Sequence, residues 1–155
     1  MIGDDGMQQW ITAQANLAQA HLTFQHVAAA LPSDCRDQAG VCGQWTPKQV
    51  AAHLAGWERE AARALHALLA GAPEDLVSDI NLFNRASVDA RTHLSWEGTC
   101  WELRAAHETL QHTIDALIQT QRYAAGYLSW MDGRIADYAV HTAQVRAWLQ
   151  HDRVD

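Results

Sequence analysis

Hydrophobic residues recur at steps of three and four along most of this chain, which is the spacing of one face of an α-helix. Sustained alternation of apolar and polar residues, the pattern of a half-buried strand, is found in no segment. The pattern therefore predicts an all-helical protein. The four long segments that carry it span about residues 7–31, 47–70, 96–117 and 132–149.

Residues typical of helix ends mark several of these boundaries. Thr46 is followed by Pro47, a residue favoured in the first helical turn, and Ser95 directly precedes the third long segment. Pro32 follows the first segment, where a proline would interrupt the helical hydrogen bonds. Gly126 is expected in the loop before the last helix, which we predict to begin near Asp132.

The stretch from Glu74 to Leu94 has a weaker apolar pattern, and we interpret it as a crossover connection with some helical content. Four amphipathic helices bury their apolar faces against one another in a helical bundle. We therefore predict an all-α fold, an antiparallel four-helix bundle with a long crossover between the second and third helices. The length predicts one domain over residues 1–155.

Charge and composition limit the partners. The formal net charge is -7 and no two Lys or Arg residues are adjacent, so a nucleic-acid partner is not expected. No apolar run approaches the ~20 residues of a membrane span, and the first residues do not resemble a signal peptide. The three cysteines are an odd number, which suits reduced thiols. These features predict a cytoplasmic protein that does not bind membranes.

One histidine of the second segment is a candidate for chemistry. His53 lies between Val50 and Trp57 on the apolar face, so its imidazole should point inward, where it needs a polar partner. On the last segment, Asp137 and His141 are four residues apart and project from the same side of the helix. Two imidazoles and one carboxylate with open positions are the ligand pattern of catalytic zinc, nickel or iron sites. The three residues are therefore a candidate divalent-metal site.

A simpler interpretation of these histidines stays open. An Asp and a His four apart commonly form only a surface hydrogen bond, and an inward His is often a core residue. His21 and His107 also lie on apolar faces, where each could orient a ligand, act as a general base or, as we favour, belong to the core. The remaining histidines are expected at the surface: His26, His66, His93, His112 and His151.

The seven tryptophans are interpreted mainly as packing residues, although aromatic side chains also line ligand pockets. Four fit core or groove positions, namely Trp57, Trp96, Trp101 and Trp148, and three lie near helix ends, namely Trp10, Trp45 and Trp130. No GxSxG or CxxC motif is present, and Cys100 lies on a buried face, so nucleophilic serine or cysteine catalysis has no support.

Three stretches of the chain together resemble the DinB-like superfamily. They are residues 45–58, which include His53, residues 83–97, and residues 137–149, which include Asp137 and His141. This superfamily consists of four-helix bundles and includes bacillithiol- and mycothiol-dependent enzymes and the mycothiol-dependent maleylpyruvate isomerase. The resemblance implies a divalent metal, zinc or nickel above all, held by His53, His141 and the residue at position 137. Many members have His at that middle position and the isomerase has Glu, whereas this chain has the shorter Asp137.

The resemblance also implies a function. We expect a metal-dependent enzyme in which a thiol or water attacks a small electrophilic molecule, as in thiol S-transferase, isomerase or hydrolase chemistry. The implied partners are a small-molecule substrate, a low-molecular-weight thiol and a second copy of the chain in a homodimer. The alternative is a non-catalytic protein of the same fold that binds a small hydrophobic ligand in a Trp-rich groove.

Overall fold

A computed structural model describes residues 4–151, and over this range the chain is all-helical, as predicted. The described residues form no strand, and their only β-type pairing is a bridge between Cys42 and Trp45. None of the described helices is long and apolar enough to cross a membrane. The five helices are α1 (Asp4–Ala29), α2 (Pro47–Leu69), α3 (Ile80–Asp89), α4 (Trp96–Thr120) and α5 (Ala125–His151).

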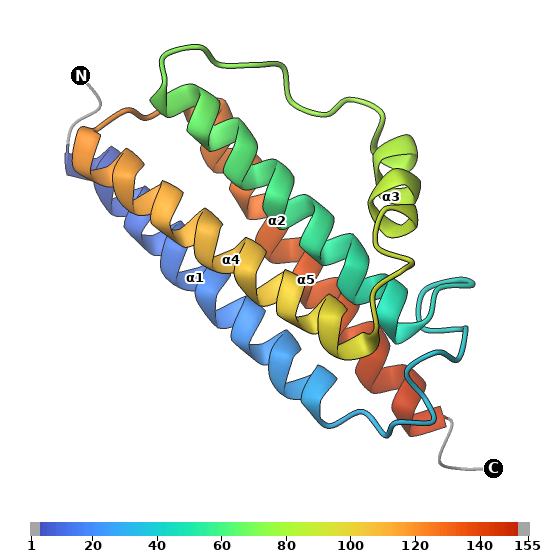
Figure 1. Ribbon diagram of the computed structural model, residues 1–155. Coiled ribbons are helices and arrows are strands. Elements are labelled where there is room, and N and C mark those ends of the chain that lie inside the picture. The colour runs from blue at the N-terminus through green and yellow to red at the C-terminus, as the bar shows by residue number, and fades with distance from the viewer. Residues whose placement is uncertain (1–3, 152–155) are drawn as a thin grey trace.

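The four long helices lie side by side, and α3 lies to one side of them, against α2 (Figure 1). In that view α1 and α5 run from upper left to lower right, while α2 and α4 run the opposite way. The most extensive helix contacts join α2 with α4 and α1 with α5. Because α2 and α4 run in the same direction, the chain must return along the molecule between them. The predicted crossover is this returning segment, and it contains α3.

Local capping explains where three helices begin. The Thr46 hydroxyl accepts a hydrogen bond from the Gln49 backbone N–H at 3.1 Å, and the Gln49 side chain accepts one from the Thr46 N–H at 3.0 Å. The Ser95 hydroxyl accepts from the Gly98 N–H at 3.0 Å. Both predicted helix starts are therefore confirmed. Asp79 caps α3 in the same way, through a bond from the Leu82 N–H at 2.9 Å that sequence reading missed.

The predicted start of the last helix was wrong. The helix α5 begins at Ala125, and Gly126, which we placed in a loop, lies inside it. Buried Tyr127 and Met131 anchor these first turns against the core, and their packing outweighs the low helix propensity of glycine. The first helix also differs slightly, since it spans Asp4–Ala29 rather than residues 7–31.

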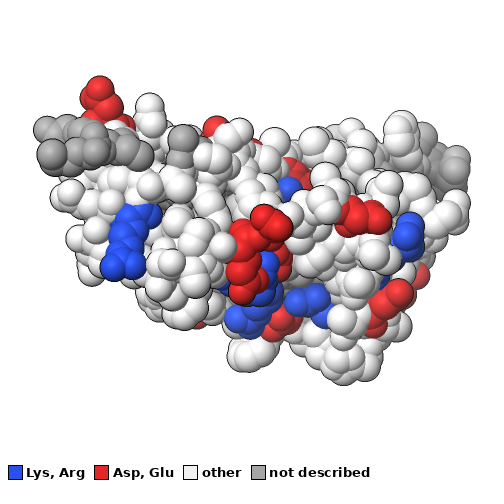
Figure 2. Space-filling model, turned by 90° about the horizontal axis from the view of Figure 1, so that it is seen from above, with Lys and Arg blue, Asp and Glu red and all other residues white. Residues whose placement is uncertain are grey.

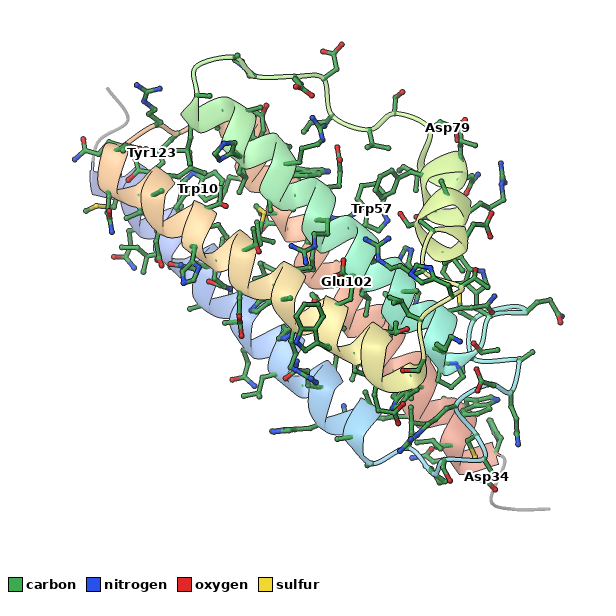
Figure 3. All side chains as sticks on the ribbon, viewed as in Figure 1. Trp10, Asp34, Trp57, Asp79, Glu102 and Tyr123 are labelled. Carbon is green, nitrogen blue, oxygen red and sulfur yellow. The ribbon has the colours of Figure 1, made fainter. Side chains whose placement is uncertain are left out.

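The core lies along the inner faces of the long helices, and the aromatic residues divide between core and surface less simply than predicted. Trp57 is buried as expected, but Trp101 is 62% exposed, whereas Trp10 near a helix end is 2% exposed. Trp10 and Tyr123 stack at 6.3 Å between ring centroids, at the end of the molecule opposite Asp34 (Figure 3). The five histidines expected at the surface are exposed.

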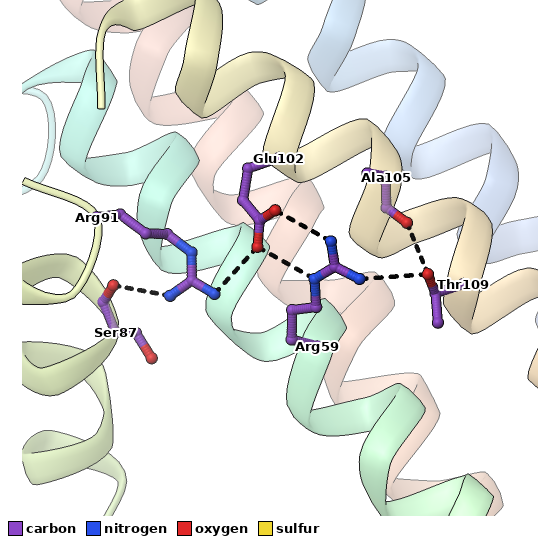
Figure 4. Close-up of polar contacts among 6 residues, drawn as sticks. All are labelled: Arg59, Ser87, Arg91, Glu102, Ala105 and Thr109. Carbon is purple, nitrogen blue, oxygen red and sulfur yellow. Dashed lines mark hydrogen bonds and ion pairs between the residues drawn. The ribbon is translucent and has the colours of Figure 1, made fainter. Parts of the chain in front are cut away.

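Contacts with α2 and α4 fix the position of α3. The side chain of Trp57 lies between α2 and α3 (Figure 3). Its ring packs on Phe83, and its indole N–H donates to Asn84 Oδ1 at 2.8 Å. Glu102 of α4 lies between Arg59 of α2 and Arg91, which follows α3 in the chain, and accepts hydrogen bonds from both (Figure 4). These paired charges hold the end of the crossover against α2 and α4. On the face seen from above, acidic and basic side chains lie next to one another, and neither sign forms a continuous patch (Figure 2).

Candidate metal centre

Three polar side chains from two helices meet between α2 and α5. His53 comes from the second turn of α2, and Asp137 and His141 come from successive turns of α5. One ligand atom from each residue can be chosen so that all lie within 4.8 Å of one another. Both imidazoles are buried, whereas the Asp137 side chain is 23% exposed. The structure thus brings together the three residues that the sequence analysis selected as a candidate metal site.

The short side chain of Asp137 reaches both imidazoles. Its Oδ2 accepts a hydrogen bond from His53 Nε2 at 3.0 Å, and its Oδ1 lies 3.3 Å from His141 Nε2. Burial acts to raise the pKa of this carboxyl group, but the bonds to His141 and His53 outweigh burial and hold the pKa well below its usual range. An ionised carboxylate therefore lies between two imidazoles, although aspartate is one methylene shorter than glutamate.

Gln144 fixes the orientation of the His141 ring. The Oε1 of Gln144 lies 2.7 Å from His141 Nδ1, and an amide oxygen only accepts, so Nδ1–H donates to it. The other ring nitrogen, Nε2, faces Asp137 Oδ1 at 3.3 Å, and because Nδ1 already carries a hydrogen, Nε2 can bond to this oxygen only through a second proton or a cation between the two atoms. A hydrogen-bonded outer nitrogen of this kind is the usual arrangement of metal-binding histidines.

The donor set fits a divalent cation. Two nitrogen donors and one carboxylate suit zinc, nickel or iron and leave coordination positions open for other ligands. Two atoms that are each about 2.1 Å from one ion stand at most about 4.2 Å apart, so the 4.8 Å spread would need to close by roughly half an ångström. His53 Nδ1 is buried with no hydrogen-bond partner among the described residues, so this ring is oriented by its bond to Asp137 and by packing against Trp45 rather than by a bond to its second nitrogen.

A guanidinium group lies beside the candidate ligands. Arg134 Nη1 is 3.5 Å from Asp137 Oδ2, and the guanidinium carbon lies 4.0 Å from the centroid of the Trp57 ring. Burial lowers the pKa of Arg134, but arginine keeps its charge in proteins. Its Nε and Nη1 atoms are buried without hydrogen-bond partners. A fixed positive charge therefore borders the triad of His53, Asp137 and His141.

A second buried polar cluster lies next to this triad, one residue further along α5. His21 Nδ1 and Tyr138 Oη are joined by a 2.9 Å hydrogen bond, and the His21 ring stacks on His107 with centroids 3.8 Å apart. His107 Nδ1 lies 3.3 Å from Glu58 Oε2. Burial and the neighbouring Glu58 raise the pKa of Tyr138 well above its usual value, so Tyr138 stays a neutral phenol. His21 and His107 are thus core residues, held by side chains.

The His21 environment predicts a pH-dependent stability. Burial, followed by the charges of His107 and Arg104, lowers the pKa of His21 from 6.5 to about 3. Between these values the unfolded chain binds a proton that the folded chain does not, so the free energy of unfolding should fall as pH decreases from 6.5 towards 3. This single group contributes at most about 1.4 kcal/mol per pH unit.

Urea denaturation of His21→Gln at several pH values between 4 and 7 measures this contribution. The variant should lose stability less steeply with acid than the wild type, whatever its stability at pH 7. His26→Gln removes an exposed histidine of the same helix and should keep the wild-type slope. Equal slopes for wild type and His21→Gln would contradict the prediction.

Sequence reasoning missed several residues around the triad. A signal for two of them was present, because positions 134, 137, 141 and 144 follow one another at steps of three and four and so share one face of α5. No comparable signal exists for Glu58, which is 2% exposed although a glutamate is rarely buried. Its burial depends on contacts from other helices that a single helical pattern does not encode.

Comparison with known proteins agrees with this arrangement. The family model for the mycothiol maleylpyruvate isomerase N-terminal domain matches residues 17–146, a range that includes His53, Asp137 and His141. This match confirms the resemblance to the DinB-like superfamily. No curated protein and no solved structure matches the chain. The chain belongs to the mycothiol maleylpyruvate isomerase N-terminal domain family.

Proposed function

We propose that this protein is a divalent-metal-dependent enzyme whose ligands are His53, Asp137 and His141. The observation that carries the proposal is the convergence of these side chains from α2 and α5, with ligand atoms within 4.8 Å. The family match supports it, because the superfamily resemblance implies ligands at these positions. Zinc and nickel suit two imidazoles and one carboxylate best, and we propose one of them as the resident metal.

A divalent cation at this position would supply Lewis acidity, which lowers the pKa of a coordinated thiol or water to near neutrality. The chain's own residues set the conditions for that chemistry. Asp137 contributes the negative charge, Gln144 holds the His141 ring, and buried surroundings limit the access of bulk water. Arg134 adds a positive charge beside the carboxylate, which favours an anionic reactant.

We propose that the reactants are a low-molecular-weight thiol and a small electrophile. The name of the family supports a mycothiol-type thiol. Addition of the thiol to a double bond of the electrophile forms a C–S bond and moves the thiol proton to the neighbouring carbon, which is S-transfer. If the C–S bond breaks again after rotation about the former double bond, the thiol is released and the electrophile is isomerised. Hydrolysis is the neighbouring possibility, with water in place of the thiol. A homodimer in the cytoplasm, without nucleic-acid or membrane partners, remains our expectation for the assembly.

Metal analysis of protein purified without a chelator and without a His-tag tests the proposal. We expect one tightly bound divalent cation per chain, and its loss in His53→Ala, because two remaining ligands bind metal weakly. His66→Ala is the matched control, since it removes an exposed histidine from the same helix and should retain the metal.

Two outcomes would argue against a metal enzyme. One is a metal-free wild-type chain whose unfolding does not respond to added zinc or nickel. The other is equal metal content in His53→Ala and the wild type. Either result would favour the alternative, a non-catalytic protein of the same family that binds a small hydrophobic ligand.

A further inference from the structure

A cavity between α1 and α4 lies apart from the candidate metal centre. Its volume is about 420 Å³, which falls within the usual range of small-molecule sites. Its lining comes from α1, α4 and the loop after α1, whereas the triad lies on α2 and α5. The two helices that form it lie next to each other (Figure 1). The proposed enzymatic function makes no use of this cavity.

The walls of the cavity are mainly apolar. Phe24, Ala28 and Leu103 are buried at its floor, and Trp96 is partly buried. Cys100 also lines it, but burial raises the pKa of this thiol to about 11, so the group is a neutral part of the wall at neutral pH. An occupant therefore needs a hydrocarbon or aromatic body to replace water against these side chains.

The charged side chains that line the cavity give it a net positive charge, whereas the whole protein is negatively charged. The charged side chains that line it are Arg36, Arg104 and Glu97. Arg36 is paired with Glu97 at 3.2 Å and lies 5.6 Å from the Trp96 ring centroid. Arg104 is exposed and has no ion-pair partner among the residues that the structure describes. One unpaired positive charge therefore remains at the cavity, on a chain of formal net charge -7.

We propose that this cavity binds a small amphipathic monoanion, with its apolar body against Phe24, Trp96 and Leu103 and its carboxylate at Arg104. A monoanion neutralises the one unpaired charge, and a guanidinium binds a carboxylate through charge-assisted hydrogen bonds. A neutral apolar ligand would leave Arg104 unpaired, and a cation would meet the positive charge of its guanidinium. The site is separate from the metal centre and functions without a bound metal.

Isothermal titration of the full-length protein with octanoate tests this site. We expect saturable binding of one octanoate per chain, with weaker binding of the neutral octan-1-ol. Arg104→Gln should weaken octanoate binding about tenfold and leave octan-1-ol binding unchanged, because it removes only the charge-assisted bond. Glu97→Gln should strengthen octanoate binding, since it leaves Arg36 without its carboxylate partner. Arg146→Gln, an exposed arginine on α5, is the matched control and should bind like the wild type.

A second pair of variants tests the location. Ala29→Phe enlarges a residue that lines the cavity and should abolish binding, whereas Ala15→Phe enlarges an exposed residue two turns or more away on the same helix and should not. His53→Ala should bind octanoate normally, so failure of the metal proposal would not affect this result.

Three outcomes would overturn the proposal. The first is equal affinity for octanoate and octan-1-ol, and the second is an unchanged octanoate affinity in both Arg104→Gln and Glu97→Gln. The third is a cavity occupied by a second copy of the chain, which would appear as a dimer that Ala29→Phe dissociates and octanoate does not enter.

Discussion

Replacing Asp137 by asparagine is expected to lower the affinity of the protein for a divalent cation by about 100-fold or more, because even residues that only support metal ligands contribute 10- to 100-fold. Asparagine keeps the size of the side chain and its amide oxygen can still accept the bond from His53. It removes the negative charge that the cation would face, and with it the main electrostatic attraction of the triad.

Competition with a chromophoric chelator measures the zinc and nickel affinities of both proteins. Asp132→Asn is the matched control, because Asp132 is exposed on the same helix and lies outside the triad. The control should differ from the wild type by less than threefold. If Asp137→Asn also stayed within threefold, Asp137 would not be a ligand, whatever the two histidines do.

Gly56→Ala should lower the free energy of unfolding by about 1–3 kcal/mol, the usual cost of inserting a methyl group into a packed contact. A Cβ atom at this position would lie 2.4 Å from Ser87 Oγ and 2.5 Å from Ser87 Cβ. Either α3 moves away from α2 or the Ser87 backbone shifts. Movement of α3 would also disturb Phe83 and Asn84, which hold Trp57.

Urea denaturation gives the free energy, and a second substitution separates crowding from other effects. Ser87→Gly removes both clashing atoms. Adding Gly56→Ala to Ser87→Gly should therefore lower the free energy of unfolding much less than adding it to the wild type. Gly133→Ala is the control, because no atom lies within 4 Å of its added Cβ. Alanine there should stabilise α5 by about 0.5–1 kcal/mol. Equal effects of the Gly56→Ala and Gly133→Ala substitutions on the free energy of unfolding would show that α3 does not pack closely against α2.

Local signals in the sequence predicted most of the helices. The capping box of Thr46 and Gln49 and the cap at Ser95 are written in consecutive residues, so they could be recognised without tertiary information. The start of α5 could not, because Gly126 has a low helix propensity and only burial of Tyr127 and Met131 keeps it helical. The exposure of Trp101 was missed for the same reason, since it depends on which helices pack around α4.

The candidate site shows a similar division. The spacing of Asp137 and His141 and the inward face of His53 were sufficient to select the three residues, because helical geometry fixes which side chains share a face. Sequence could not show that the shorter Asp137 reaches both rings, since this depends on the distance between α2 and α5. The stack of His21 on His107 joins α1 and α4, and no pattern within one helix predicts such a contact.

The positions of the ligands on the helices have a mechanical consequence. Because α2 packs mainly on α4 and α1 mainly on α5, the chain is built from two helix pairs, and the triad takes one ligand from the first pair and two from the second. A cation held there would cross-link the two helix pairs, which contact each other less than the helices within each pair do. Its binding energy would therefore also resist their separation, by an amount that grows with metal concentration.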